Sequence, residues 1–166
     1  MPYSLDAINQ MSQAQFVSAL GDIFEQTPSI AQFAWHDRPF ESVEDLHQKM
    51  TAIVNALDSE AQIALIAAHP DLGSKAKMAD ASIKEQAGVG LDRLTPSEYD
   101  RFQTLNQAYK TRFGFPFIVA VKNHTKTSIL AAFEERLQHF QSEEQQRAIA
   151  EISQIAYFRL IDQVKP

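Results

Sequence analysis

Residues 95–114, TPSEYDRFQTLNQAYKTRFG, carry the strongest helix signals of the chain. Thr95 is a good N-cap residue, Pro96 suits the first helical position, and Glu98 places a carboxylate in the first turn. Gly114 suits the position just after a helix. The stretch therefore predicts a helix that begins after Thr95 and ends at Gly114.

Comparable patterns recur along most of the sequence. Serine caps, apolar residues at helical spacing and a stop at Pro70 predict further helices. These helices cover residues 13–24, 43–57, 60–69, 126–140 and 142 to nearly the C-terminus. The predicted fold class is all-α, a single compact helical-bundle domain over residues 1–166 with about seven or eight helices.

One segment departs from this pattern, Phe115–Val121, with the sequence FPFIVAV. Its periodicity is compatible with an extended strand and with a buried helical turn. Pro116 disfavours helix at Phe115, so the extended form is favoured. The backbone N–H and C=O groups of a lone strand need partners. A ligand rich in amide-like groups and the neighbouring side chains are two alternative sources.

The composition narrows the classes of function. A formal net charge of −6 without a basic run argues against nucleic acid and against anionic membrane surfaces as partners. No apolar stretch is long enough to span a membrane, and the N-terminus lacks the features of a signal peptide. We expect a soluble cytoplasmic protein.

The sequence also lacks the spacing of a metal or nucleotide site. Cysteine is absent, and the five histidines show no metal-ligand spacing. The stretch Gly88–Gly90 does not follow a predicted strand, so it is no dinucleotide fingerprint. We expect a protein without a metal.

The chemically richest stretch is residues 69–91, HPDLGSKAKMADASIKEQAGVGL. His69 ends a predicted helix, where a histidine can simply bond the last carbonyl groups. Pro70 forces the chain to turn there, and Asp71 is close enough in sequence to orient an imidazole. His69 is therefore a candidate acid–base residue, with the helix-end role as the alternative.

Ser82, Glu85 and Gln86 form a second polar group. Ser-x-x-Glu is the spacing of a capping box, so the start of a helix is a strong alternative role for Ser82 and Glu85, and it is compatible with a role in a site. A helix start also favours anions. An ionised Glu85 there can accept a proton, and Gln86 offers a donor and an acceptor together.

Arg159 lies in the middle of the apolar stripe of the last predicted helix. A guanidinium in that place must find an anion or reach water, because an unpaired buried charge costs several kcal/mol. A core carboxylate and a carboxylate-bearing ligand are the two alternatives.

Three motifs together resemble one protein family. They are HPDLG at 69–73, Ser-x-x-Glu-Gln at 82–86 and RFGFPF at 112–117, with the helix that bears Arg159 as a further match. They are similar to the 2-oxo-4-hydroxy-4-carboxy-5-ureidoimidazoline (OHCU) decarboxylases, over most of the chain. The resemblance implies an all-helical, cofactor-independent enzyme that forms (S)-allantoin at the end of the urate-to-allantoin route. It also suggests a homodimer. The chain departs from some relatives in a shorter run between Gly73 and Ser82.

The resemblance also implies the site. His69 matches the family's catalytic histidine, and Glu85 is suited to the proton transfers. The implied substrate-binding residues are Pro70, Ser82, Gln86, Phe117, Ile118, Val119, Ala120, Val121 and Arg159. Two rival classes stay open beside this one, a small helical adaptor domain and a hydrolase acting on a neighbouring ureide.

Overall fold

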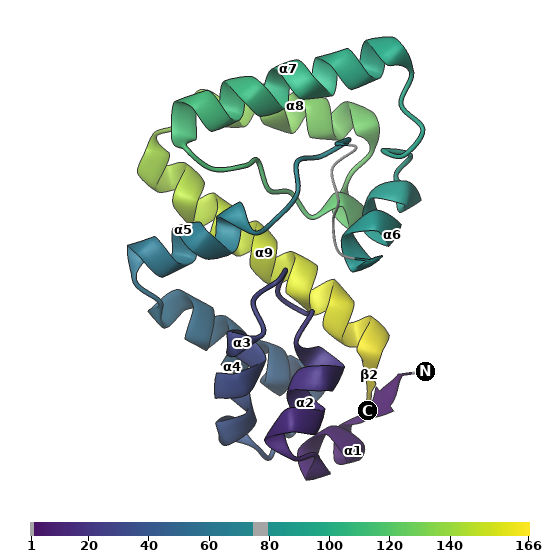
Figure 1. Ribbon diagram of the computed structural model, residues 1–166, viewed down its shortest axis with the longest axis vertical. Coiled ribbons are helices and arrows are strands. Elements are labelled where there is room, and N and C mark those ends of the chain that lie inside the picture. The colour runs from purple at the N-terminus through teal and green to yellow at the C-terminus, as the bar shows by residue number, and fades with distance from the viewer. Residues whose placement is uncertain (1, 75–79) are drawn as a thin grey trace. The chain divides into compact units, whose positions relative to one another are not determined.

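The computed structural model describes residues 2–74 and 80–166. Nine α-helices are present in these two ranges, which confirms the all-α fold class (Figure 1). Two of them, α1 (Leu5–Gln10) and α3 (Ser29–Ala34), were not predicted and have six residues each, and a third, α6 (Asp80–Gly88), was predicted only through the alternative in which Ser82 starts a helix. Six residues cover less than two turns, too little for a helical period to stand out.

Along the chain the elements are β1 Tyr3–Ser4, α1 Leu5–Gln10, α2 Gln13–Leu20, α3 Ser29–Ala34, the 3₁₀ turn η1 Trp35–Asp37, α4 Val43–Ala56, α5 Ser59–Ala67, α6 Asp80–Gly88, α7 Pro96–Phe113, the 3₁₀ turn η2 Val121–Asn123, α8 Lys126–Arg136, α9 Gln141–Gln163 and β2 Val164–Lys165. Among the described residues, no helix is both long enough and apolar enough to cross a membrane.

The chain divides into two compact units. The first unit contains the residues up to Leu65 together with Ser153–Pro166, and the second is Ile66–Ile152. The division falls within α5 and within α9. The expectation of a single domain over residues 1–166 stays a prediction.

The first unit is built on the amphipathic helices α2, α3 and α4, of which α3 packs against both of the others. Ser12 caps α2 in a capping box with Gln15, as its position predicts. The helix ends at Leu20 and not at Phe24, although Phe24 is buried. Apolar spacing continues into the following turns, so it could not locate the helix end.

Two short strands close the first unit. Tyr3 pairs with Val164 in a parallel two-stranded ladder of β1 and β2, so the beginning and the end of the chain lie side by side (Figure 1). Each strand has only two residues, which is too short for an alternating pattern in the sequence.

The second unit is organised by α7, which agrees with its prediction at both ends. Thr95 caps it in a capping box with Glu98, and Gly114 follows in the left-handed conformation with φ 81°. The helix lies beside α8 (Figure 1). Its buried side chains include Tyr109 and Phe113, whose ring centroids are 4.6 Å apart.

A cluster of aromatic rings forms the core of the second unit. Phe117 stacks on Phe133 of α8 with a centroid separation of 3.8 Å, and its ring lies 5.2 Å from that of Tyr109. Phe117 belongs to the segment that departs from helical periodicity. That segment is therefore part of the hydrophobic core, not a surface loop.

The cap of α7 predicts a pH-dependent contribution to stability. The Thr95 backbone N–H, and secondly the Lys126 ammonium 3.2 Å from Glu98, hold the pKa of Glu98 below its ordinary value of 4.5. A lowered folded-state pKa stabilises the protein above pH 4.5, and this stabilisation is lost as the pH falls through the folded-state pKa. We expect Glu98→Gln, which keeps an acceptor for Thr95, to unfold more easily than the wild type at neutral pH. The difference should disappear in acid. Thermal melting of both proteins across the pH range measures it, and a difference that persists at low pH would show that the charge is not its source.

Candidate active site

The loop that follows α5 is held by side chains from two other helices. The regular part of α5 ends at Ala67, two residues before the predicted end, and the His69 N–H bonds the Ile66 carbonyl at 3.1 Å in a final turn. Further along, Asn106 Nδ2 donates to the Leu72 carbonyl at 2.8 Å. This buried bond ties the loop to α7.

An ion pair adds a second tie to α7. Lys110 Nζ lies 2.7 Å from Asp71 Oδ2, and both side chains are only partly exposed. The sequence suggested that Asp71 could orient the His69 imidazole, whereas the structure gives Asp71 a different partner, Lys110. His69 itself is buried, with 7% of its surface exposed. A buried imidazole just beyond a helix end is compatible with an acid–base role.

The predicted polar group on residues 82–86 lies inside α6. This helix begins at Asp80, so Ser82 and Glu85 are not its cap, and the capping-box interpretation is wrong. Residues at positions i, i+3 and i+4 share one helix face, so Ser82, Glu85 and Gln86 lie together. Ser82 and Gln86 are buried and Glu85 is half-buried.

Gln86 joins this helix face to the loop of residues 69–73. Its Oε1 accepts a hydrogen bond from the Gly73 backbone N–H at 3.0 Å. Because a backbone N–H can only donate, the carbonyl end of the Gln86 amide must face Gly73. The orientation of the amide is thereby fixed, and its NH₂ end points the other way as a donor.

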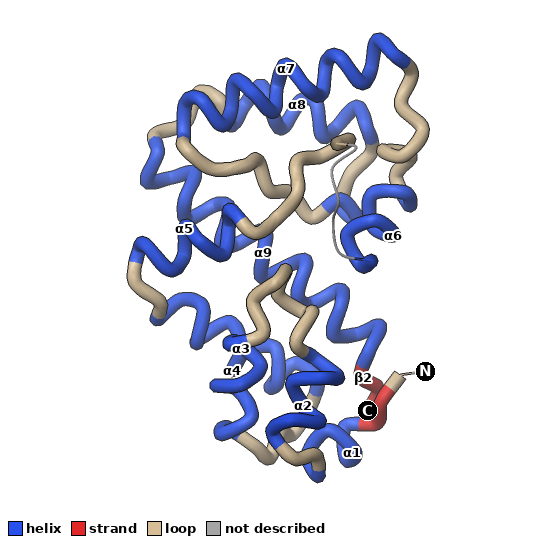
Figure 2. Tube along the Cα trace, viewed as in Figure 1, coloured by secondary structure: helices blue, strands red, loops and turns tan. Residues whose placement is uncertain are grey.

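The segment after α7 is neither helix nor strand from residue 116 to residue 120 (Figure 2). Ala120 has extended backbone angles, and η2 begins at Val121. In the described chain the only sheet is the β1–β2 ladder, so this segment has no strand partner there. The prediction of a lone, non-helical segment is confirmed for residues 115–120 and is wrong for Val121, which already belongs to the 3₁₀ turn η2.

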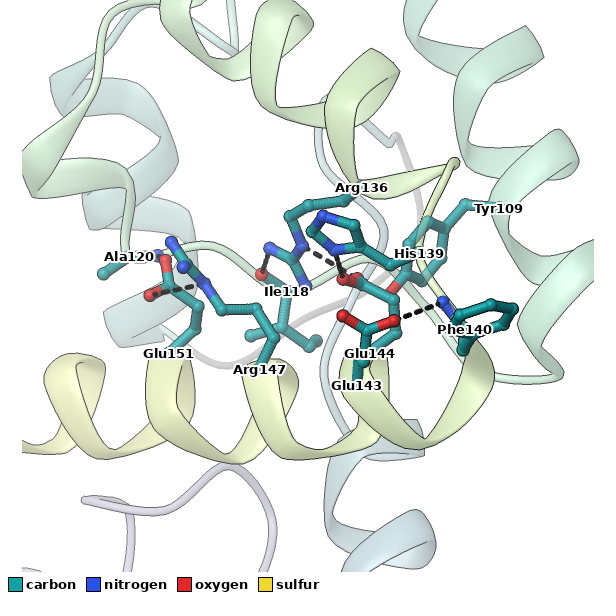
Figure 3. A network of polar contacts seen from close by, with 10 residues as sticks. All are labelled: Tyr109, Ile118, Ala120, Arg136, His139, Phe140, Glu143, Glu144, Arg147 and Glu151. Atoms are coloured by element: carbon teal, nitrogen blue, oxygen red, sulfur yellow. Dashed lines mark hydrogen bonds and ion pairs between the residues drawn. The ribbon is translucent and has the colours of Figure 1, made fainter.

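Neighbouring side chains satisfy part of its backbone. Arg136 Nη1 of α8 donates to the Ile118 carbonyl at 2.5 Å (Figure 3). The Ala120 N–H donates to Glu151 Oε1 of α9 at 3.2 Å. The Ala120 carbonyl accepts from the Asn123 N–H at 3.0 Å. The partners of these three backbone groups are therefore neighbouring side chains and a nearby backbone N–H, and not a ligand.

The predicted residues of the second unit come together through two contacts. The Gln86–Gly73 bond joins the α6 face to the loop that starts at His69. Helix α6 also packs against η2, the continuation of the segment from Phe117. The structure therefore brings the loop, the α6 face and the end of the non-helical segment into one neighbourhood. Residues 75–79, in the run between Gly73 and Ser82 that distinguishes this sequence from some relatives, lie outside the described residues.

Sequence reasoning missed a largely buried polar cluster that contacts that segment through Arg136, made by Tyr109, Arg136, Glu144 and the partly exposed His139 (Figure 3). Burial, and then the hydrogen bond to Glu144, raise the pKa of Tyr109, so it stays a neutral donor. A signal for Arg136 exists in the sequence. It lies three and seven residues after two core positions of α8, the same pattern that singled out Arg159.

Arg159 lies in the first unit and is buried on the apolar stripe of α9, as predicted. Its Nη2 is 3.0 Å from Glu25 Oε2, and its Nη1 donates to the Asp22 carbonyl at 3.2 Å. Glu25 is 1% exposed. The structure thus supplies the core carboxylate of the structural alternative. A contact between Arg159 and a ligand stays a prediction.

Within the ranges 2–74 and 80–166, no three His, Asp or Glu side chains come close enough together to hold a metal ion.

Comparison with known proteins identifies relatives over nearly the whole chain. The family model described as OHCU decarboxylase matches residues 9–161. The 2-oxo-4-hydroxy-4-carboxy-5-ureidoimidazoline decarboxylase of Halalkalicoccus jeotgali is 42% identical over 98% of this chain and 93% of its own length. The uric acid degradation bifunctional protein PucL of Bacillus subtilis is 47% identical over 96% of this chain, which spans only 32% of that protein.

Solved structures show the same relationship. The crystal structure of an (S)-allantoin synthase superposes with a TM-score of 0.81 at 32% sequence identity, over 99% of this chain and 54% of that chain. A structure of an OHCU decarboxylase superposes with a TM-score of 0.70 at 20% identity, over 92% of this chain and 97% of that one. The second likeness concerns the fold alone.

The anchored loop predicts a specific role for Gly73. Its φ is 68°, and a Cβ there would lie 2.7 Å from Leu94 Cδ1. We expect Gly73→Ala to lower the free energy of unfolding by about 1–2 kcal/mol, because a side chain disfavours the left-handed region. Gly88→Ala is the matched control, since its Cβ would meet no heavy atom within 4 Å. The control should be neutral or stabilising by up to about 1 kcal/mol. Urea denaturation measures both, and equal effects would contradict the proposed strain.

The Arg159–Glu25 pair predicts a large effect in the first unit. Arg159→Met leaves Glu25 as a buried carboxylate without its cation, so the free energy of unfolding should fall by about 3–5 kcal/mol. Removing both charges in Glu25→Leu/Arg159→Met should restore much of the loss. Chemical denaturation of the single and double variants measures this. A single variant as stable as the wild type would favour a ligand as the partner of Arg159.

Proposed function

The chain belongs to the OHCU decarboxylase family, and from this premise we propose that it is a carboxy-lyase that converts OHCU to (S)-allantoin in urate degradation. The observation that carries the proposal is the site in the second unit. There the buried His69, the polar face of α6 and the segment Phe117–Val121 lie in one neighbourhood inside the matched region.

The substrate itself explains how the reaction can proceed. OHCU carries a carboxylate and a hydroxyl on one ring carbon, next to an imine carbon that bears the ureido group. When carbon dioxide leaves, the bonding electrons form a C=C bond within the ring, and the imine nitrogen takes up the displaced electron pair together with one proton. The product of this step is an enol–enamine. Protonation of the ureido-bearing carbon from one face, with loss of the hydroxyl proton, then gives (S)-allantoin.

His69 and Glu85 are the proposed catalytic residues. His69 bonds the ring hydroxyl and the neighbouring carboxylate, which holds the bond to be broken out of the ring plane. Its burial excludes water that would otherwise compete for these contacts. Glu85 is half-buried on the same helix face as Ser82. It transfers protons to or from the hydroxyl or the ring nitrogen of the substrate.

Gln86 and Ser82 are the proposed ligands of the ureido and ring amide groups, with Pro70 beside His69. The Gln86 Oε1 is engaged by Gly73, so its Nε2 is the end that reaches the substrate. The Gln86 NH₂ group is therefore the proposed donor to a carbonyl oxygen of the substrate. An orientation fixed in the free protein reduces the entropy lost on binding.

The backbone of Phe117–Val121 is the proposed partner of the remaining amide-like groups. The Ile118 carbonyl and the Ala120 N–H are taken by Arg136 and Glu151. In an extended backbone the N–H and C=O of one residue point away from those of its neighbours. We therefore assign the N–H and C=O of Val119, which lies between these two residues, to the substrate. Arg159 stays in the proposal through the family likeness, as a ligand of polar substrate oxygens. We also propose that the protein is a cytoplasmic homodimer and that it has no nucleic-acid or membrane partner.

One assay tests the reaction class. The protein is mixed with fresh intermediates of urate oxidation, with a chelator and without added cofactor, because the imine supplies the electron sink. Optical activity and released carbon dioxide are followed together. A decarboxylase gives optically active allantoin with carbon dioxide, a ureide hydrolase opens a ring without that release, and an adaptor domain does neither.

The His69 variant tests the catalytic assignment. We expect His69→Ala to lower turnover at least about 10²-fold, the usual loss for an acid–base group, while the fold persists. The exposed His36 is the matched control, and His36→Ala should leave turnover unchanged. Steady-state kinetics and circular dichroism of both variants measure this. Normal turnover in a folded His69→Ala protein would remove His69 from the mechanism.

A further inference from the structure

The buried polar cluster of the second unit is centred on one ion pair. Arg136 Nε lies 2.8 Å from Glu144 Oε1, with the two side chains 3% and 0% exposed (Figure 3). The same carboxylate accepts from the Tyr109 hydroxyl at 2.5 Å and contacts His139 Nδ1 at 2.8 Å. Glu144 is therefore surrounded by three partners from different parts of the unit.

Stability alone does not account for this pair. Taking two charges out of water is expensive, and replacement of a buried ion pair by apolar residues of similar size is often neutral or stabilising. An all-apolar arrangement here would suit a core that is otherwise aromatic. An apolar arrangement, however, contains no hydrogen-bond donor that could be held in a fixed direction.

The structure shows where that donor points. Arg136 Nη1 donates to the Ile118 carbonyl at 2.5 Å, and the guanidinium carbon lies 4.3 Å from the centre of the Phe117 ring. One side chain thus holds the carbonyl of one residue of the segment and the ring of its neighbour. Glu144, by fixing Nε, sets the direction of the Nη1 group.

Glu151 completes the attachment two residues further on. Its Oε1 accepts from the Ala120 N–H at 3.2 Å, while its Oε2 lies 3.6 Å from Arg147 (Figure 3). The segment is therefore held at residues 118 and 120 by side chains of α8 and α9. Without a strand partner among the described residues, these contacts take the place of a sheet ladder.

We propose that Arg136, oriented by Glu144, is a positioning residue that holds the backbone of Phe117–Val121 in the conformation that binds substrate. The inference rests on the proposed function of that backbone. Arginine suits this role because its planar fork binds a carboxylate through Nε and a carbonyl through Nη1 at once. A lysine has one ammonium and cannot reproduce that geometry.

Two variants test the proposal. The first removes the ion pair together with the Tyr109 hydroxyl, in Tyr109→Phe/Arg136→Met/Glu144→Leu, so that no buried charge is left unpaired and only the partly exposed His139 remains of the cluster. The second is Arg136→Lys, which keeps the charge beside Glu144. The matched control is Arg101→Met/Glu134→Leu, an Arg–Glu pair of the same unit with side chains 50% and 60% exposed.

The kinetic constants separate positioning from stability. A loss of folded protein lowers the concentration of active enzyme and therefore the apparent kcat, but leaves KM unchanged. A displaced binding group raises KM. We expect both cluster variants to raise KM about tenfold, the equivalent of one hydrogen bond to the substrate. The control should keep the KM of the wild type.

The possible results of these measurements either support or overturn the positioning role of Arg136. A folded triple variant with the wild-type KM would overturn the positioning role. If the triple variant does not fold, Arg136→Lys decides in the same way. A wild-type protein that does not decarboxylate OHCU would overturn the proposed function and this inference with it. An active wild type with unaltered cluster variants would overturn the inference alone.

Discussion

The structure of the second unit depends on the hydrogen bonds that satisfy the backbone of one extended segment, which has no neighbouring strand among the described residues. The residues from Phe115 to Val121 are apolar and buried, so their N–H and C=O groups are removed from water. The Arg136–Glu144 ion pair and Glu151 supply partners from side chains where a sheet would supply them from another strand. These charged side chains thus satisfy backbone groups of the segment, which apolar side chains cannot do.

Helix α7 connects this segment to the candidate active site. Asn106 and Lys110 hold the Leu72 carbonyl and the Asp71 carboxylate of the loop that follows His69. Tyr109, between them in sequence, donates to Glu144. The spacing of three and four residues places these side chains close together on the helix surface. The register of α7, set by the caps at Thr95 and Gly114, therefore determines the loop and the ion pair together.

Arg136 and Arg159 show the limit of one kind of sequence argument. Each lies on an apolar stripe of its helix, each is buried, and each pairs with a buried glutamate. The pattern shows correctly that a guanidinium in such a place needs an anion. It does not show whether the anion is a ligand or a side chain distant in sequence, because that depends on which helices meet. For Arg159 the glutamate lies 134 positions away in the chain.

The sequence by itself determined the longer helices, the departure of residues 115–120 from helical structure and the motifs that carry the family resemblance, because each depends on residues close together in the chain. Caps, a proline, a glycine in the left-handed region and a period of 3.6 residues are local properties. The tertiary structure decided which predicted groups meet. It placed Ser82 and Glu85 inside α6, turned the Gln86 amide toward Gly73, and paired Asp71 with Lys110 and Arg159 with Glu25. Hydrogen bonds and ion pairs act over a few ångströms in space between residues far apart in sequence, so only the packing of the helices could select those partners.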